Sequence, residues 1–167
     1  MTEKHENNAG FSLFELIVVM VIIGLGSAIV IPRFFGSFSS MEVNAAARKT
    51  VSALKYAKNL SVYTNTPHLV SLNTNERLVR VERILVDEDR PGVQNIRLEN
   101  VQDIRLGDGI LLQVDNFYKE APANGIFQFL FFPSGASRTG SIVLSNSDGD
   151  VQHIIIDSVT GFAKLES

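Results

Sequence analysis

One acidic residue near the N-terminus, Glu15, lies in an apolar segment, where a carboxylate requires either a cationic partner or a functional role. Glu15 begins a long apolar run, "FSLFELIVVMVIIGLGSAIVIP", four residues after Phe11 and five after Gly10. A charged side chain in lipid costs about 2.5 to 3.5 kcal/mol on insertion scales. Cleavage after Gly10 would supply a cation, because it would create an α-amino group on Phe11. That amine could meet Glu15 in the same helix, or neutralise Glu15 of a neighbouring parallel helix and so specify the register of a filament.

Patterns that support catalysis are lacking. The chain has no cysteine, which excludes disulfides, thiolate metal sites and a cysteine nucleophile. Its three histidines, His5, His68 and His153, belong to no spaced ligand motif, and no G-x-S-x-G elbow or phosphate loop is present. Ser134 could suggest a nucleophile, but its surroundings predict a turn. The segment "NSDGD" at 146–150 could suggest the start of a calcium loop, but no bidentate glutamate follows, so a hairpin turn is predicted. The sequence therefore predicts no enzyme, no cofactor and no metal site.

The element that holds Glu15 is an apolar segment of membrane length. No residue from Leu16 to Pro32 is charged, and with the preceding residues the run reaches the roughly 20 positions needed to cross a bilayer core. We expect a transmembrane and assembly helix over residues 11–33. A secretory signal peptide is the alternative, but its apolar core usually has only about 7 to 15 residues. Pro32 removes a helical donor, which predicts a kink or local melting near residues 28–32.

An amphipathic helix is expected over residues 34–66, ending at about Tyr63, with Ser39 or Ser40 as the cap of a restarted helix. Its apolar pattern recurs at steps of three and four: Val43, Ala47, Val51, Leu54 and then Ala57 or Lys58. The basic residues on this segment are Arg48, Lys49, Lys55 and Lys58. They form either a solvated face or a contact strip for acidic partner subunits.

From residue 67 to 167 the pattern changes to short strands separated by turns. A hairpin is predicted from strands at 68–73 and 77–84, and four further strands from "IFQFLFF", "SIVLSN", "VQHIIID" and "FAKL". Two or three strands and a long loop are expected within 85–124. The fold class is therefore α+β, with a long N-terminal helix packed on one antiparallel sheet or on a two-sheet domain.

The N-terminal segment resembles the class III leader of type IV prepilins and type II secretion pseudopilins. Gly10, Phe11, Glu15 and Pro32 carry the resemblance, within "GFSLFELIVVMVIIGLGSAIVIP". The likeness implies that residues 1–10 are a leader, which a prepilin peptidase removes on the cytoplasmic side before it N-methylates Phe11. It implies a single-pass protein of the bacterial inner membrane, with its C-terminal domain in the periplasm.

The remaining chain is similar to the H-type minor pseudopilins of the GspH/FimT-like family, in "AARKTVSALKYAKNLSVYTNTPHLVSL" and "FFPSGASRTGSIVLSNSDGDVQHIIIDSVTGFAKL". The resemblance implies a structural subunit near the tip of a periplasmic pseudopilus that supports export of folded proteins. Its implied partners are other major and minor pseudopilins, the inner-membrane secretion platform, and the secretin or exoprotein cargo.

Two alternatives stay open. One is a FimT-like minor pilin of a type IV pilus, which would serve motility or DNA uptake. The other is an enzyme or binding protein on a simple anchor. The net charge of −3 and the mixed ending "GFAKLES" give no basic patch, so nucleic acid is not expected as a partner.

Overall fold

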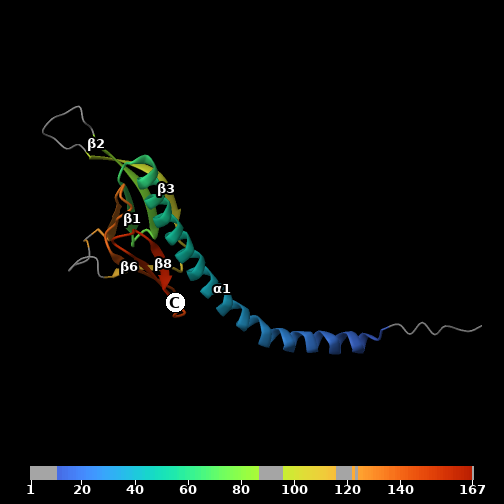
Figure 1. Ribbon diagram of the computed structural model, residues 1–167. Helices are drawn as coiled ribbons and strands as arrows, with labels where there is room; N and C mark the ends of the chain where they lie inside the picture. The colour runs from blue at the N-terminus through green and yellow to red at the C-terminus, as the bar shows by residue number, and fades with distance from the viewer. Residues whose placement is uncertain (1–10, 87–95, 116–121, 123, 167) are drawn as a thin grey trace, which may run out of the picture. The chain divides into compact units, whose positions relative to one another are not determined.

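The computed structural model describes residues 11–86, 96–115, 122 and 124–166, and within the long helix it leaves out the side chains of residues 28–38. Gly10 and the rest of the predicted leader lie outside the described residues. The chain divides into two compact units, Met1–Phe38 and Ser39–Ser167. We refer to the second as the globular unit (Figure 1).

A single helix, α1, spans Leu13–Thr64. No break occurs at Ser39, so the predicted restart of the helix at Ser39 or Ser40 is wrong. The backbone is also helical through Pro32, which argues against local melting there, whereas the kink stays a prediction. Within the described part of the chain, no helix combines the length and the apolar character that crossing a membrane requires.

The C-terminal half of α1 carries the predicted apolar stripe. Its buried face comprises Val43, Ala46, Ala47, Val51, Ala53, Leu54 and Ala57. The helix ends because Asn65 adopts a left-handed conformation with φ of 52°, a common way to stop a helix. Thr64 lies just before this point, and its hydroxyl donates a hydrogen bond to the Leu60 carbonyl at 2.7 Å. The predicted end at about Tyr63 is confirmed to within one residue.

The first sheet has the strand order β3-β2-β1-β5, and all of its pairs are antiparallel. Its strands are β1 (His68–Asn73), β2 (Leu78–Val86), β3 (Ile96–Arg105) and β5 (Ile126–Phe131). The predicted hairpin is confirmed as the β1–β2 pair, in which Asn73 opposes Leu78. The Asn73 side chain accepts bonds from the amides of Asn75 and Glu76, both at 3.0 Å, which closes the turn.

The second sheet has the order β4-β6-β7-β8 and is also antiparallel. Its strands are β4 (Leu111–Asp115), β6 (Gly140–Ser145), β7 (Val151–Ile156) and β8 (Ala163–Glu166). The "NSDGD" segment is the β6–β7 turn, as predicted. The side-chain oxygen of Asn146 accepts hydrogen bonds from the backbone amides of Asp148 and Asp150. Its side-chain nitrogen donates to the hydroxyl of Ser39 on α1 at 2.7 Å.

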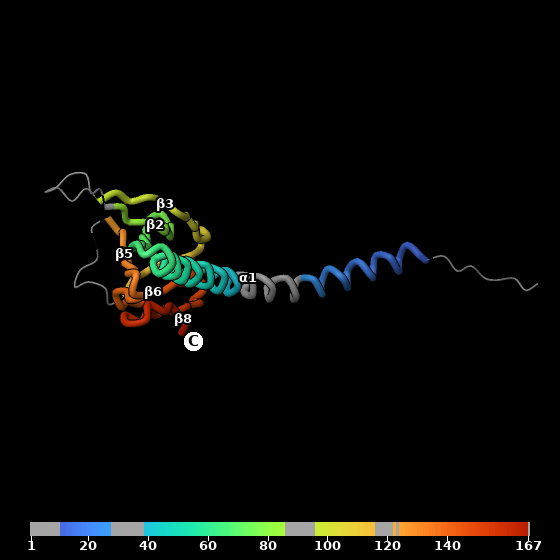
Figure 2. The backbone as a smooth tube through the Cα atoms, turned by 45° about the horizontal axis from the view of Figure 1, so that its top comes forward, coloured from blue at the N-terminus to red at the C-terminus, as the bar shows by residue number. Residues whose placement is uncertain are grey.

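The core of the globular unit joins α1 to both sheets. One apolar cluster includes helix residues together with Val70 and Phe129 of the first sheet and Ile142 and Ile154 of the second. Figure 2 shows the two groups of strands with the C-terminal half of α1 running beside both. The sequence left open one antiparallel sheet or a two-sheet domain, and the structure has two sheets, with the buried stripe of α1 contributing to the core that they share.

Candidate functional site

Two of the predicted site residues lie at the start of α1: Glu15 in its first turn and Phe11 just before it. Ser12 is the cap of this helix, because its hydroxyl accepts the amide of Glu15 at 3.2 Å and its carbonyl accepts the amide of Leu16 at 3.2 Å. Sequence reasoning missed Ser12. The signal that could have found it is the S-x-x-E spacing of "SLFE", which is typical of a capped helix start.

Glu15 therefore lies in the first helical turn, where a carboxylate is favoured by the unpaired amides and the helix dipole. Its side chain is exposed and takes part in none of the salt bridges between described residues. Phe11 is 86% exposed and directly precedes Ser12. Pro32 is 17 residues beyond Glu15, so about 25 Å of helix separates these two predicted sites.

The helix surface after Glu15 is apolar and uncovered. Large side chains between Phe11 and Leu25 are exposed on every side of the helix, including Leu13, Phe14, Ile17, Met20, Val21 and Ile22. Gly24 and Gly26 face open space, with no heavy atom within 4 Å of a Cβ built on either. A helix that is apolar all round is suited to burial among other helices or in lipid, and small residues let such helices approach closely.

The chemistry of this segment is that of an assembly element. It offers apolar area, two small positions and one carboxylate beside the helix start. Among the described residues, no group of three or more histidine, aspartate or glutamate side chains could hold a metal ion.

The N-terminal segment matches a family model, and about three quarters of the chain matches solved structures. Residues 6–31 match the prokaryotic N-terminal methylation motif. The minor pseudopilin EpsH of the Vibrio cholerae type 2 secretion system superposes with a TM-score of 0.55 at 14% identity, over 75% of this chain and 97% of that one. The type IV minor pilin FimU of Pseudomonas aeruginosa gives a TM-score of 0.55 at 13% identity, over 75% and 89%. A comparison with curated protein sequences finds no match.

The chain thus has a pilin-like fold, and its N-terminal segment carries the prokaryotic methylation motif. The predicted recognition and the predicted α+β pilin-like fold are both confirmed at this level. The assignment of Gly10, Phe11, Glu15 and Pro32 to processing and assembly stays a prediction.

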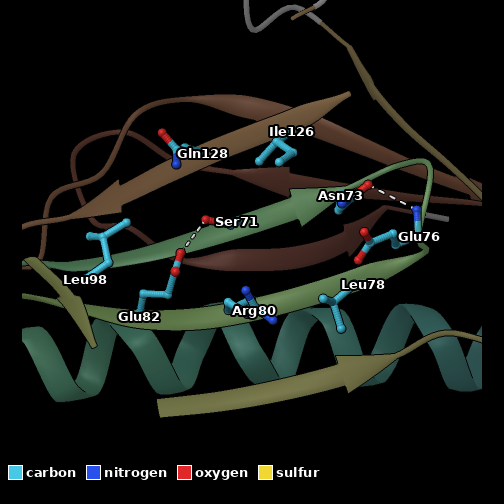
Figure 3. A pocket seen from close by; sticks show the side chains of 9 residues that line it. All are labelled: Ser71, Asn73, Glu76, Leu78, Arg80, Glu82, Leu98, Ile126 and Gln128. Carbon is cyan, nitrogen blue, oxygen red and sulfur yellow. Dashed lines mark hydrogen bonds between the residues drawn. The ribbon is translucent and has the colours of Figure 1, made fainter. Parts of the chain in front are cut away.

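The globular unit of this pilin-like chain has a depression of about 280 Å³ on the first sheet (Figure 3). Ser71 points toward Glu82 across β1 and β2, and donates to its carboxylate at 2.6 Å. None of the described residues that line the depression is a histidine, and the Ser71 hydroxyl is held by the Glu82 carboxylate instead.

Arg80, which also lines the depression, donates two hydrogen bonds of 2.7 and 2.9 Å to the carboxylate of Asp103 on β3. These bonds lower the pKa of Asp103 and raise the pKa of Arg80. Both side chains are more than a third exposed, so the pair is a bidentate salt bridge at the surface rather than a buried ion pair.

Two turns of the pilin-like chain pack against each other and against α1. Gly135 lies in the "FPSGAS" turn and Gly161 in the "SVTG" turn, with φ of 86° and 62°. A Cβ on Gly161 would overlap the carbonyl oxygen of Gly135. The Lys58 ammonium lies 3.3 Å from the centroid of the Phe162 ring, which fastens the second turn to the helix. Both glycines belong to the C-terminal segment that carries the family resemblance, and here they have a packing role.

Proposed function

We propose that this chain is a minor pseudopilin, a structural subunit at or near the tip of a type II secretion pseudopilus, which supports export of folded proteins across the outer membrane. The observation that carries the proposal is an exposed apolar helix with the methylation motif, joined to a globular unit with the fold of EpsH. The solved structures that the chain resembles are pseudopilins and pilins, which supports a role without catalysis.

In this proposal, a prepilin peptidase cuts between Gly10 and Phe11 and methylates the new amine. The helix over residues 11–33 holds the subunit in the inner membrane until it enters the filament. Ser12 supports this role because, as the second residue after the cut, it caps the start of the helix. The Phe11 amine and the Glu15 carboxylate then lie at the same end of the helix.

Glu15 selects the position of the subunit in the filament. Its exposed carboxylate has no cation among the described side chains, so the α-amino group of an adjacent staggered helix is the proposed partner. Pairing these charges within an apolar bundle offsets part of the cost of burying either one alone. Pro32 provides local compliance when subunits pack.

A second candidate is a minor pilin of a type IV pilus. FimU superposes on the chain with the same TM-score as EpsH, 0.55. Both candidates require other pilin-like subunits and the same processing enzyme, and they differ in what the filament moves.

The test is quantitative mass spectrometry of supernatant proteins from a strain that lacks the gene, complemented with either the wild-type chain or Glu15→Val. Loss of a defined set of folded exoproteins, restored by the wild type only, is the expected result. An unchanged supernatant together with lost surface motility would reject the secretion role in favour of the pilus role. Full function of the Glu15→Val strain would reject assembly through Glu15.

A further inference from the structure

An open groove lies between α1 and β3 in the globular unit. Its volume is about 560 Å³, and its walls are Arg48, Lys49 and Ser52 of the helix and Gln102, Asp103, Ile104 and Arg105 of the strand. Consecutive residues of a strand point to opposite faces of the sheet. A groove that touches four consecutive residues of β3 therefore runs along the edge of the strand rather than over one face.

The groove has a positive rim. Arg48, Lys49 and Arg105 are exposed, and none of them takes part in a salt bridge between described residues. The one acid in the wall, Asp103, is already neutralised by the two bonds from Arg80. Three cations thus face the groove in a chain whose net charge is −3.

A second depression extends the groove along the helix. It has a volume of about 380 Å³, shares Arg48 with the first, and is lined by Met41, Asn44 and Ala45 as well. Met41 is 64% exposed, so this end offers apolar surface beside the basic rim. The helical stretch from Met41 to Ser52 is about 16 Å long, which equals roughly five residues of an extended chain.

The strand side of the groove has free backbone groups. Among the described strands, β3 lies at one edge of its sheet and pairs on one side only, with β2. Nearly all of its ten residues are exposed. In Figure 2 it is the outer strand of its group, with no other labelled strand beyond it. Such an edge presents N–H and C=O groups that an added strand can pair with.

We infer that this groove docks an acidic, extended segment of a partner protein, which adds to the free edge of β3 and places its carboxylates against Arg48, Lys49 and Arg105. Main-chain bonds to an edge strand supply affinity, and alternate side chains supply specificity. Arginine side chains add charge-assisted bonds to carboxylates. A protein segment fits better than nucleic acid because none of the described residues that line the groove is aromatic and could stack on a base. The inference holds whether the filament secretes proteins or forms a pilus.

The test uses the full-length chain in detergent micelles and a fluorescent synthetic peptide that alternates Glu with Val, followed by anisotropy. We expect the double variant Arg48→Glu, Lys49→Glu to weaken binding by on the order of tenfold. Lys164→Glu is the matched control, because it reverses an exposed charge on the second sheet and should leave binding unchanged. Arg105→Gln, a milder change on the strand side, should weaken binding by a few-fold.

Two further peptides test the mode of docking. Methylating the backbone amides at one alternate set of positions should abolish binding, while methylating the other set should leave it, because an added strand pairs through one edge. Equal binding of both methylated peptides would overturn strand addition. Equal binding of a Gln and Val peptide, or the same loss in Lys164→Glu as in the double variant, would overturn the charge argument. Tighter binding of a single-stranded oligonucleotide, lost in the double variant, would assign the groove to nucleic acid and overturn the proposal.

Discussion

Replacing Gly161 with alanine should destabilise the globular unit through two separate effects. The residue has a φ of 62°, and a left-handed backbone costs an L residue with a Cβ about 1 to 2 kcal/mol. The new Cβ would also overlap the carbonyl oxygen of Gly135, which belongs to backbone and cannot swing aside. Forcing such packing to shift typically costs about 1 to 3 kcal/mol. The expected loss in unfolding free energy is therefore about 2 to 5 kcal/mol.

Gly149→Ala is the matched control for this variant. Gly149 also has a positive φ, 91°, but nothing lies within 4 Å of the Cβ position. Its substitution carries the backbone cost alone, about 1 to 2 kcal/mol. The difference between the two variants thus isolates the contact between the "SVTG" and "FPSGAS" turns.

Thermal unfolding of the full-length chain, followed by circular dichroism, measures both effects. At roughly 4 °C for each kcal/mol, Gly161→Ala should lower the Tm by about 8 to 20 °C and Gly149→Ala by about 4 to 8 °C. Equal shifts for the two variants would refute the argument that the two turns are tightly packed against each other.

The remaining predictions concern the helix start and one surface ion pair. Glu15→Val should be processed and inserted but recovered poorly in sheared filaments, and a wild-type yield would contradict the pairing of Glu15. Gly10→Val should retain the leader in intact-mass spectrometry, and a mature start at Phe11 would exclude the proposed cut. Asp103→Asn should cost about 0.2 to 1 kcal/mol in urea unfolding at pH 7, because Arg80 loses a charged partner at an exposed site. The pKa of Asp103 is lower in the folded state than its value of about 3.9 in the unfolded state. The stability that the Asp103 charge contributes is therefore fully present above about pH 3.9 and is lost as the pH falls through the folded-state pKa. A loss that does not diminish at acid pH would show that the carboxylate charge is not its cause.

Relations between residues close in the chain were predictable from the sequence. The buried stripe of α1 follows from apolar residues at helical spacing, because neighbouring turns of a helix repeat every 3.6 residues. The β1–β2 hairpin follows from two β-type runs around the Asn73 turn. The methylation motif is likewise local, since it is a fixed order of residues within 6–31. The helix cap at Ser12 is also local, because the S-x-x-E spacing of "SLFE" is typical of a helix start.

Relations between distant segments came only from the tertiary structure. The pairing of β1 with β5 joins residues 68–73 to 126–131, and the contact of Gly161 with Gly135 joins two turns that look independent in sequence. The basic residues of α1 allowed either a solvated face or a contact strip, and the structure set Arg48 and Lys49 beside Arg105 on a free strand edge. Local spacing determines which side of a helix or strand is apolar, because backbone geometry repeats over a few residues. Which elements then share a core, and which polar side chains meet at its border, depends on long-range packing that no local period encodes.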